Sequence, residues 1–498
     1  KTKAMAWVLA PLLLLVFLSG SSSALVHSGA DDHGDDYTIV AMSSLRPEAT
    51  CWGHRVIPPY NGSWVPLSRP LGPCSPSGAA PVASLDELLR QDQLRVDDIL
   101  KKLSGDVRDN KDDGDKPPVD LEETQYNYDP TIKTKVGTQT PPPSDSTQGL
   151  SIDPEAGSAA ASSSSPRWSN LPGVEQTVVL DTASDVPWVQ CSPCPVPPCH
   201  PQTDTLYDPT RSPTYSAFRC NAPTCTRLGP YANGCLNGQC QYRVVYPDGS
   251  SSSGTYSSDR LTLDPTNSIA NFQFGCSHAV RGTFNRRTAG IMALGGGPES
   301  LISQASSTYG DAFSYCLPPT ASYHGFFVLG APRVASSRYV LTPLLRYRNV
   351  PTFYRVLLRA ITVAGRRIDV APSAFAAGAV MTSRTIVTRL PPTAYVALRA
   401  AFRNSMGMYR LAKPKGGLDT CYDFTGVGKV RLPRIELVFD GDAVVELDPS
   451  GVLFNDCLAF VPNRDDAMPG IIGNLQQQTI EVLYDVGGGA VGFRRNAC

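Results

Sequence analysis

Val179-Leu180-Asp181-Thr182-Ala183-Ser184 is the most informative stretch of the chain. Its two apolar residues are typical of a buried strand that ends at Asp181. The small Ala183 allows a close approach to a neighbouring segment, and the hydroxyls of Thr182 and Ser184 can hydrogen-bond and hold the carboxylate. These residue types suit a catalytic carboxylate at a strand end. The tetrapeptide alone also fits an ordinary turn, so its surroundings decide the interpretation.

The part of the chain around this motif reads as β structure. From about Val174 onward, short apolar runs alternate with turn residues, as in Phe272–Phe274, Val356–Val363 and Ile435–Phe439. This pattern predicts an all-β core, and its length is too great for one sandwich, so we expect two β lobes. One helix is predicted from Pro392 to about Asn404, with an early proline and apolar residues on one side.

Further motifs follow in order, and with the first they resemble the pepsin-like aspartic peptidases, in particular the nepenthesin-type branch of plants. The resemblance covers about Val174 to Cys498 and rests on these stretches: Asp181–Cys191, Tyr246–Ser250, Phe274–Cys276, Phe313–Cys316, Thr342–Leu344, Ile471–Asn474, Gln476–Gln478 and Gly492–Phe493. It implies an all-β, two-lobe acid protease fold with a central cleft and one catalytic Asp from each lobe. It implies hydrolysis of polypeptides by water activated between the two carboxylates, with no cofactor and no metal. Asp181 matches the first of these residues, and Tyr246 matches the tyrosine of the flap over the cleft.

The second catalytic motif is altered. The matching stretch is Val380-Met381-Thr382-Ser383-Arg384-Thr385, where the resemblance leads us to expect Asp at position 382 and Gly at position 384. The supporting hydroxyls predicted around the two sites, Thr182, Ser184, Ser383 and Thr385, are retained. Thr382 cannot share a proton as a carboxyl group does. Arg384 either points toward Asp181 or turns to solvent.

These features leave three hypotheses for function. The first is a member of the aspartic endopeptidase family with weak or absent activity, because a dyad that acts as a unit is incomplete. The second is a non-catalytic pepsin-fold protein that binds or inhibits a protein target. The third is an active enzyme whose second carboxylate comes from elsewhere in the chain.

Cysteine usage indicates an oxidising compartment. Fourteen cysteines are present, and twelve lie between Cys191 and Cys498. The Cys191-x-x-Cys194 spacing beside His200 would also suit zinc, but so many nearby cysteines favour disulfides. The family resemblance implies the pairs Cys191–Cys194, Cys199–Cys276, Cys220–Cys240, Cys225–Cys235, Cys316–Cys498 and Cys421–Cys457. Cys51 and Cys74 are the remaining two, and they could pair with each other.

The N-terminal third is predicted to be processed. Residues 1–24 have the charged start, short apolar run and small residues of a signal peptide, and residues 25–165 read as a pro-segment and linker. Ser84 to Glu87 is a capping box that opens a helix over 85–103 with one apolar stripe. We assign residues 166–335 to the N-terminal lobe with its Cys-rich insert and 336–498 to the C-terminal lobe. Residues 168–172 do not supply the strand that the resemblance implies before Val174, so we expect the first lobe to lack it.

The charge of the chain and its predicted signal peptide limit which partners it can have. The net charge of −1 argues against a nucleic-acid partner. Residues 85–155 carry a net charge of −8 and residues 171–498 a net charge of +6. The acidic segment could therefore dock on the basic body, or it could be a solvated linker. We expect a monomer that has no membrane contact after signal removal, is secreted or vacuolar, and binds its own pro-segment and a polypeptide substrate or protein target in the cleft.

Overall fold

The structure is a computed structural model of the 498-residue chain. It describes residues 36–46, 50–58, 64–70, 72–75, 84–105, 128–139, 172–246, 248–282, 284, 287–330 and 338–498. The predicted signal peptide lies outside these ranges. Within them, none of the helices has the length and hydrophobicity that a bilayer crossing requires.

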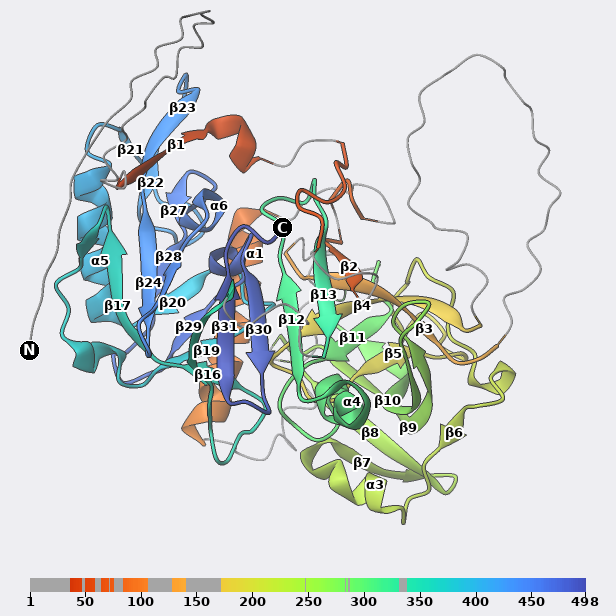
Figure 1. The fold of residues 1–498 in the computed structure, drawn as a ribbon. Helices are drawn as coiled ribbons and strands as arrows, with labels where there is room; N and C mark the ends of the chain where they lie inside the picture. Colours follow the sequence, from red (N-terminus) through yellow and green to blue (C-terminus); the bar gives the residue numbers. More distant parts are fainter. Residues whose placement is uncertain are drawn as a thin grey trace, which may run out of the picture. The chain divides into compact units, whose positions relative to one another are not determined.

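One large sheet organises the first lobe, and it contains 15 strands (Figure 1). The lobe's strands are β4 Val174–Asp181, β5 Trp188–Gln190, β6 Ser216–Ala217, β7 Ala232–Leu236, β8 Gln239–Val245, β9 Ser251–Thr262, β10 Ser268–Arg281 and β11 Gly290–Ala293. Its helices are η3 Pro209–Arg211, α3 Pro223–Arg227, η4 Gly229–Tyr231 and α4 Leu301–Tyr309. The same sheet also contains β12 Ala312–Cys316 and β13 Gly325–Leu329 of the first lobe, and β14 Val340–Pro343, β30 Glu481–Asp485 and β31 Ala490–Arg494 from residues 338–498.

Residues 338–498, called the second lobe here, contribute β14, β30 and β31 to the large sheet and otherwise form smaller sheets. Its other strands are β15 Leu345–Arg346, β16 Tyr354–Val356, β17 Leu358–Val363, β18 Arg366–Arg367, β19 Ala379–Met381, β20 Thr388–Leu390, β21 Leu411–Ala412, β22 Cys421–Tyr422, β23 Lys429–Pro433, β24 Ile435–Phe439, β25 Ala443–Glu446, β26 Leu453–Phe454, β27 Cys457–Leu458, β28 Phe460–Pro462 and β29 Gly470–Ile472. Its helices are η6 Pro372–Phe375, α5 Pro392–Ser405, α6 Pro449–Val452 and η7 Leu475–Gln477. The predicted helix at 392–404 is confirmed as α5, which buries Tyr395, Leu398 and Phe402.

The two lobes repeat one local arrangement of three strands. In the first lobe, β11 runs parallel to β4 and antiparallel to β5. In the second lobe, β29 runs parallel to β19 and antiparallel to β20. This repeat places Asp181, the last residue of β4, and Thr382, the residue after β19, at equivalent positions.

The N-terminal third contributes elements to both lobes. These are β1 Tyr37–Ala41, η1 Met42–Leu45, β2 Val65–Ser68, α1 Leu85–Ser104 and β3 Thr131–Val136. The predicted helix is confirmed as α1, in which the Ser84 hydroxyl accepts a hydrogen bond from the Glu87 N–H at 3.3 Å. The strand β2 lies between β13 and β3 in the large sheet.

The expectation that the first lobe lacks its leading strand is wrong. Strand β3 pairs antiparallel with β4 along its whole length, from Thr131 opposite Val179 to Val136 opposite Val174. Gly137 follows with a positive φ of 84°. Residues 131–136 lie within the predicted pro-segment and linker, and not directly before Val174 where the resemblance places the strand. Residues 137–173 separate β3 from β4 in the sequence. The Lys and Thr residues of β3 also interrupt the apolar pattern by which a strand is predicted.

All fourteen cysteines form disulfides, but four of the predicted pairs are wrong. The pairs Cys51–Cys74, Cys316–Cys498 and Cys421–Cys457 agree with prediction. The corrected pairs are Cys191–Cys276, Cys194–Cys199, Cys220–Cys235 and Cys225–Cys240.

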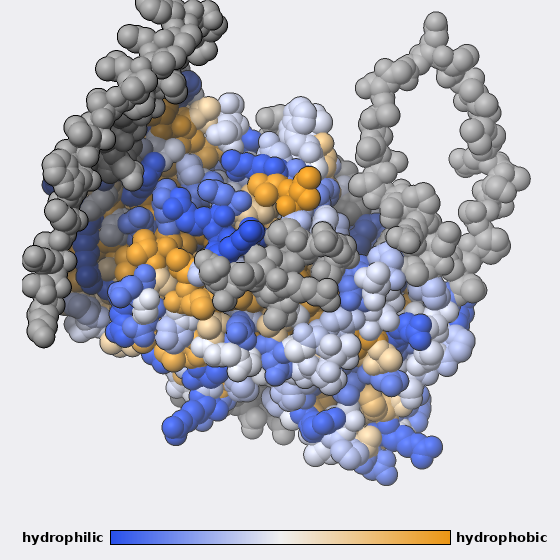
Figure 2. Space-filling model, viewed as in Figure 1, coloured by the Kyte–Doolittle hydropathy of each residue, from blue (hydrophilic) through white to orange (hydrophobic). Residues whose placement is uncertain are grey.

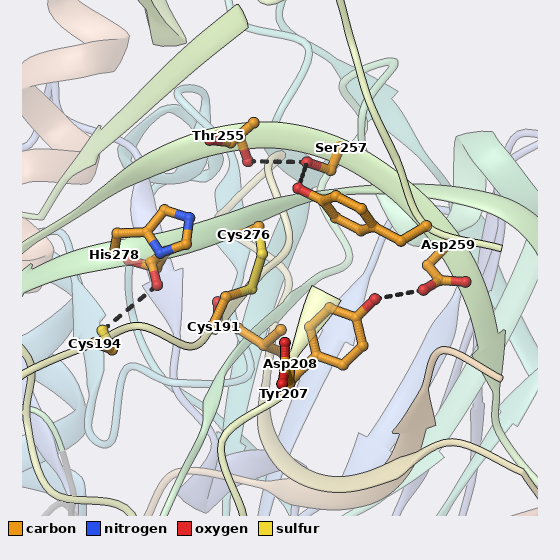
Figure 3. Close-up of a disulfide and its surroundings, with 12 residues drawn as sticks. Cys191, Cys194, Tyr207, Asp208, Thr255, Ser257, Asp259, Cys276 and His278 are labelled. Carbon is orange, nitrogen blue, oxygen red and sulfur yellow. Dashed lines mark hydrogen bonds between the residues drawn. A yellow bond between two sulfur atoms is a disulfide. The ribbon is translucent and has the colours of Figure 1, made fainter. Parts of the chain in front are cut away.

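Strand register and burial explain the corrected pairs. β5 runs parallel to β10 with Val189 opposite Cys276, so Cys191 just after β5 reaches that cysteine (Figure 3). In the Cys-rich insert, Cys225 and Cys240 both belong to one buried cluster and pair with each other.

Hydrophobic side chains also appear at the surface of the second lobe. Figure 2, drawn from the same side as Figure 1, shows such residues gathered on the half of this face that carries the second-lobe elements. The large apolar residues exposed in or against this lobe include Ile39, Val396, Met408, Leu411 and Val444.

Candidate active site

The predicted first catalytic residue, Asp181, lies at the end of β4 and beside the altered motif of residues 380–385. The Asp181 carboxylate accepts hydrogen bonds from the Ala183 N–H and the Ser184 hydroxyl, each at 2.9 Å. Its side chain is buried, and it faces the altered motif of the second lobe. The local sequence places the carboxylate here because β4 ends at Asp181 and a turn at Thr182 and Ala183 follows it.

The two motif loops brace each other. The Ser383 N–H donates to the Thr182 hydroxyl at 3.0 Å, and the Thr182 N–H donates to the Ser383 hydroxyl at 3.2 Å. Ser383 also donates its hydroxyl to the Leu180 carbonyl at 2.9 Å. The retained Thr and Ser therefore form a reciprocal link between the lobes. The Thr385 hydroxyl, in contrast, is buried and has no hydrogen-bond partner among the described residues.

Thr382 occupies the position equivalent to Asp181. Its hydroxyl accepts long hydrogen bonds from the N–H groups of Arg384 and Thr385, each at 3.4 Å. Its carbonyl accepts from the Gln477 side-chain amide at 2.9 Å. The side chain is buried and carries no acid that could exchange a proton with Asp181.

Arg384 points inward and binds two carboxylates at once. Its Nη1 donates to Asp181 at 3.0 Å, while its Nε and Nη2 donate to the two oxygens of Asp129 at 3.2 and 3.1 Å. Arg95 of α1 donates to the Arg384 carbonyl at 2.7 Å and lies 3.9 Å from Asp129. Two arginines thus face two aspartates in a buried cluster with balanced charge.

This cluster determines the charge state of Asp181. Burial alone would raise the pKa of its carboxyl group, but the Arg384 guanidinium and the Ala183 N–H outweigh that effect, and the pKa falls below the ordinary 3.8. The same pairing with Asp129 and Asp181 raises the pKa of Arg384 despite its burial. Asp181 is therefore held as an anion beside a fixed cation.

Tyr246, the predicted flap residue, lies close to the site. Its hydroxyl accepts a hydrogen bond from the Trp188 indole N–H at 2.7 Å, and its ring packs edge-on against Phe284. Burial raises the pKa of Tyr246 far above its usual range, so the hydroxyl remains protonated. Tyr246 lines the same cavity as Asp181 and Arg384.

Helix α1 covers this region. The cavity that remains over the site is about 70 Å³, which is room for only a few water molecules. Its walls include Arg95, Ile99 and Lys102 of α1. The apolar stripe of α1 packs in the core of the second lobe, where Val96 and Ile99 join a buried cluster with Phe353, Val380 and Ile471.

A buried ion pair fastens α1 beside the altered motif. The Asp92 carboxylate accepts hydrogen bonds from the Ile386 and Val387 N–H groups at 2.7 and 3.3 Å and pairs with Arg389 at 3.2 Å. Asp97 of the same helix pairs with Arg464 at 2.9 Å. The acidic N-terminal segment thus contacts basic residues of the second lobe, as the docking hypothesis expects.

One other buried carboxyl group lies near the site. Asp185 accepts hydrogen bonds from the Gly297 N–H at 2.8 Å and from the Thr352 and Tyr231 hydroxyls at 2.6 and 3.3 Å. Burial raises the pKa of Asp185. Its oxygens point to these donors, so it ties the first lobe to Thr352 of the second and does not form a pair with Asp181.

Sequence reasoning missed Asp129, Arg95 and Asp92. Each is separated from its partner in the second motif by more than 250 residues, and no local pattern marks any of them. The opposite net charges of the N-terminal segment and the body were the available signal, and they indicated only that contact was feasible.

The described residues offer one group with the composition of a metal site, Cys51, Cys74 and His324. Its two cysteines are joined in a disulfide, which removes the thiolates that would bind a metal. The group lies apart from Asp181 and has no role in the candidate site.

Comparisons with known proteins agree with this geometry. Residues 170–331 and 353–495 match the family models described as xylanase inhibitor N-terminal and C-terminal. An aspartyl protease family protein of Arabidopsis thaliana is 32% identical over 486 residues, which cover 95% of each chain. Aspartic proteinase nepenthesin-2 of Nepenthes gracilis is 32% identical over 340 residues, covering 65% of this chain and 74% of the relative. The chain belongs to the pepsin-like aspartyl protease family, in its nepenthesin-related plant branch.

Solved structures support the fold. The crystal structure of conglutin gamma, a basic 7S globulin from lupine seeds, aligns with a TM-score of 0.51 at 22% identity and covers 65% of this chain and 88% of that chain. Basic 7S globulin from soybean aligns with a TM-score of 0.52 at 20% identity, covering 64% of this chain and 87% of that chain. The predicted mainly-β, pepsin-like fold is confirmed.

Proposed function

We propose that this chain is a pepsin-fold protein without ordinary aspartic peptidase activity. The observation that carries the proposal is the Arg384 guanidinium, which lies between Asp181 and Asp129 and pairs with both. The peptidase mechanism needs two carboxylates that share one proton, so that one activates water and the other donates to the scissile carbonyl. Here the equivalent of the second carboxylate is Thr382, and Asp181 is neutralised by a permanent cation.

In this proposal, the protein binds or inhibits a polypeptide target instead of cleaving it. Support comes from the retained fold of a polypeptide-cleaving family and from the braced loops around Asp181, which keep the site ordered without completing it. Helix α1 over the site is consistent with the predicted pro-segment, and the seven disulfides fit an oxidising compartment such as the cell exterior or vacuole.

A second candidate is an active peptidase that uses Asp129 as its other carboxylate. Asp129 is the acid on the opposite side of the Arg384 guanidinium from Asp181. The two carboxylates cannot share a proton while Arg384 lies between them, so this function requires Arg384 to move away during the reaction.

An activity assay separates the two candidates. We expect the purified wild-type protein to cleave neither a denatured protein nor short peptides at acidic pH, and pepstatin to leave any residual cleavage unchanged. Pepstatin-sensitive cleavage that is lost in both Asp181→Asn and Asp129→Asn would overturn the proposal and establish the second candidate. The variant Asp440→Asn, which alters an exposed ion pair with Arg359, is the matched control.

Restoring the motif provides the complementary test. In Thr382→Asp/Arg384→Gly, the two carboxylates regain a shared proton, and we expect a gain of pepstatin-sensitive cleavage by a factor of about 10² or more. Adding Asp92→Asn to both the parent and the restored protein loosens α1, so that a covered site is not mistaken for an inactive one. Equal activity of the two proteins with α1 loosened would contradict the assignment of Thr382 and Arg384 as the cause.

A further inference from the structure

Strand β23 in the second lobe has an unusual partner. β1 and β23 form a two-stranded sheet of their own, with Tyr37 opposite Pro433 and Ala41 opposite Lys429. The ladder extends at both ends, because the Met42 N–H donates to the Gly428 carbonyl at 3.1 Å and the Arg434 N–H donates to the Asp36 carbonyl at 3.0 Å. Among the described residues, β1 is the only strand that pairs with β23.

Side chains of β1 enter the core of the second lobe. Val40 and Met42 are 5% and 8% exposed and belong to the main hydrophobic cluster, whereas Ile39, the residue before Val40, is 62% exposed. The Arg431 guanidinium lies 3.4 Å from the centre of the Tyr37 ring, and Arg434 donates to the Thr38 hydroxyl at 3.3 Å. The second lobe thus holds β1 through backbone hydrogen bonds, apolar packing and contacts with arginine side chains.

Removal of β1 would leave a complete acceptor surface. Val430 and Leu432 of β23 are buried, so the strand stays in place, but the backbone groups facing β1 would have no partner. An exposed edge strand with free N–H and C=O groups is a template for a further strand. The vacated positions of Val40 and Met42 would provide two apolar pockets beside it.

We infer that the β23 edge is a docking site for an extended polypeptide, which β1 fills while the N-terminal segment is attached. Residues 36–42 lie near the start of the predicted pro-segment, so cleavage on the C-terminal side of residue 46 would open the edge and leave β3 and Asp129 in place. This inference does not depend on whether the protein is catalytically active.

The contacts of β1 define the polypeptide that fits. It adds antiparallel to β23 and carries apolar side chains at two alternate positions, those of Val40 and Met42. An aromatic residue at the Tyr37 position stacks on Arg431, and an acidic residue precedes it, as Asp36 does. Lys429 and Arg431 make this edge basic, while Arg434 pairs with Glu446 at 3.6 Å, and the charges of Lys429 and Arg431 favour an acidic partner segment. Recognition of this kind is β-strand addition, in which backbone bonds supply affinity and alternate pockets supply specificity.

The ladder pattern provides a matched pair of proline variants for a test. Because the Met42 N–H faces β23, the Val40 N–H also faces it and the Ile39 N–H points away. In the full-length chain, Val40→Pro removes a ladder bond and a buried side chain, whereas Ile39→Pro removes neither. The probe is a fluorescein-labelled peptide with the sequence of residues 36–46, and binding is measured by fluorescence anisotropy.

We expect saturable one-to-one binding of this peptide to Val40→Pro and at least tenfold weaker binding to the wild type and to Ile39→Pro. The same peptide carrying Val40→Pro is expected not to bind. Val40→Ser/Met42→Ser frees the edge without a proline, and circular dichroism checks that each variant is folded. Binding to the freed variants no stronger than to the wild type, or equal binding of the Val40→Pro peptide, would overturn the inference.

Discussion

At the scale of single residues, two substitutions change the chemistry of the site. A carboxyl at position 382 could share a proton with Asp181, but the Thr382 hydroxyl cannot. Glycine at position 384 would leave open space, but Arg384 fills it with a cation that pairs with Asp181 at 3.0 Å. The surrounding hydroxyls of Thr182 and Ser383 still brace the loops. The geometry of the site is therefore kept while its acid–base function is replaced by an ion pair.

The pKa of Asp181 tests this account directly. We expect the pKa of Asp181 to lie below 3.8 in the folded wild type and to be higher in Arg384→Met than in the wild type. The substitution removes the largest effect that opposes burial, while the Ala183 N–H and Arg95 remain. Carbon-13 NMR of labelled aspartate can follow this carboxyl, with Asp181→Asn identifying its signal. A wild-type pKa above 3.8 would contradict the ion pair.

The same pair makes stability depend on pH. A carboxyl whose pKa is lower in the folded state stabilises the fold above its unfolded pKa, and this contribution is lost as the pH falls through the folded pKa. Arg384→Met should therefore lower the free energy of unfolding at neutral pH by about 3–5 kcal/mol. The deficit should shrink below pH 3.8. Arg359→Met, which breaks an exposed pair, is the control in denaturant titrations, and a deficit that does not change with pH would argue against the assignment.

At the scale of elements, helix α1 shows how a segment distant in sequence becomes part of the site. Its apolar stripe packs into the second lobe, and its acidic residues meet arginines of that lobe. Local signals predict the helix correctly, since the Ser84 cap and the three-and-four spacing are short-range features. Its position over Asp181 depends on long-range packing, which those signals do not contain.

Two aspartates on α1 provide a paired test of its anchoring. Asp92→Asn removes the partner of buried Arg389, and we expect a loss of about 3–5 kcal/mol in the free energy of unfolding. Asp98→Asn on the same helix breaks a half-buried pair with Lys102 that keeps contact with solvent, and it should cost less than about 1 kcal/mol. Urea titration measures both. Equal effects would mean that the Asp92 pair does not fasten the helix.

At the scale of the whole molecule, disulfides join segments that the sheet has already brought together. Cys316–Cys498 ties the C-terminus to β12 over a separation of 182 residues. Cys191–Cys276 joins the end of β5 to β10, which run side by side (Figure 3). Pairing therefore follows strand register and burial. Of the predicted pairs, two that the family resemblance implied and the remaining pair Cys51–Cys74 agree with the structure.

Peptide mapping without reduction checks the corrected pairs. We expect linked fragments for Cys191–Cys276 and Cys194–Cys199, and for Cys220–Cys235 and Cys225–Cys240 in the insert. The three remaining bonds serve as internal references within the same digest. A fragment linking Cys199 to Cys276 would contradict the register of β5 on β10.

The sequence alone determined the class of fold, the helices α1 and α5, the strand that ends at Asp181 and the loss of the second carboxylate. Each of these depends on residue type and short-range pattern, which the chain carries locally. Only the tertiary structure decided where Arg384 points, that Asp129 and Arg95 complete its cluster, that β3 supplies the leading strand and which cysteines meet. These features join residues far apart in the chain, and their geometry follows from strand register and from the need to pair buried charges.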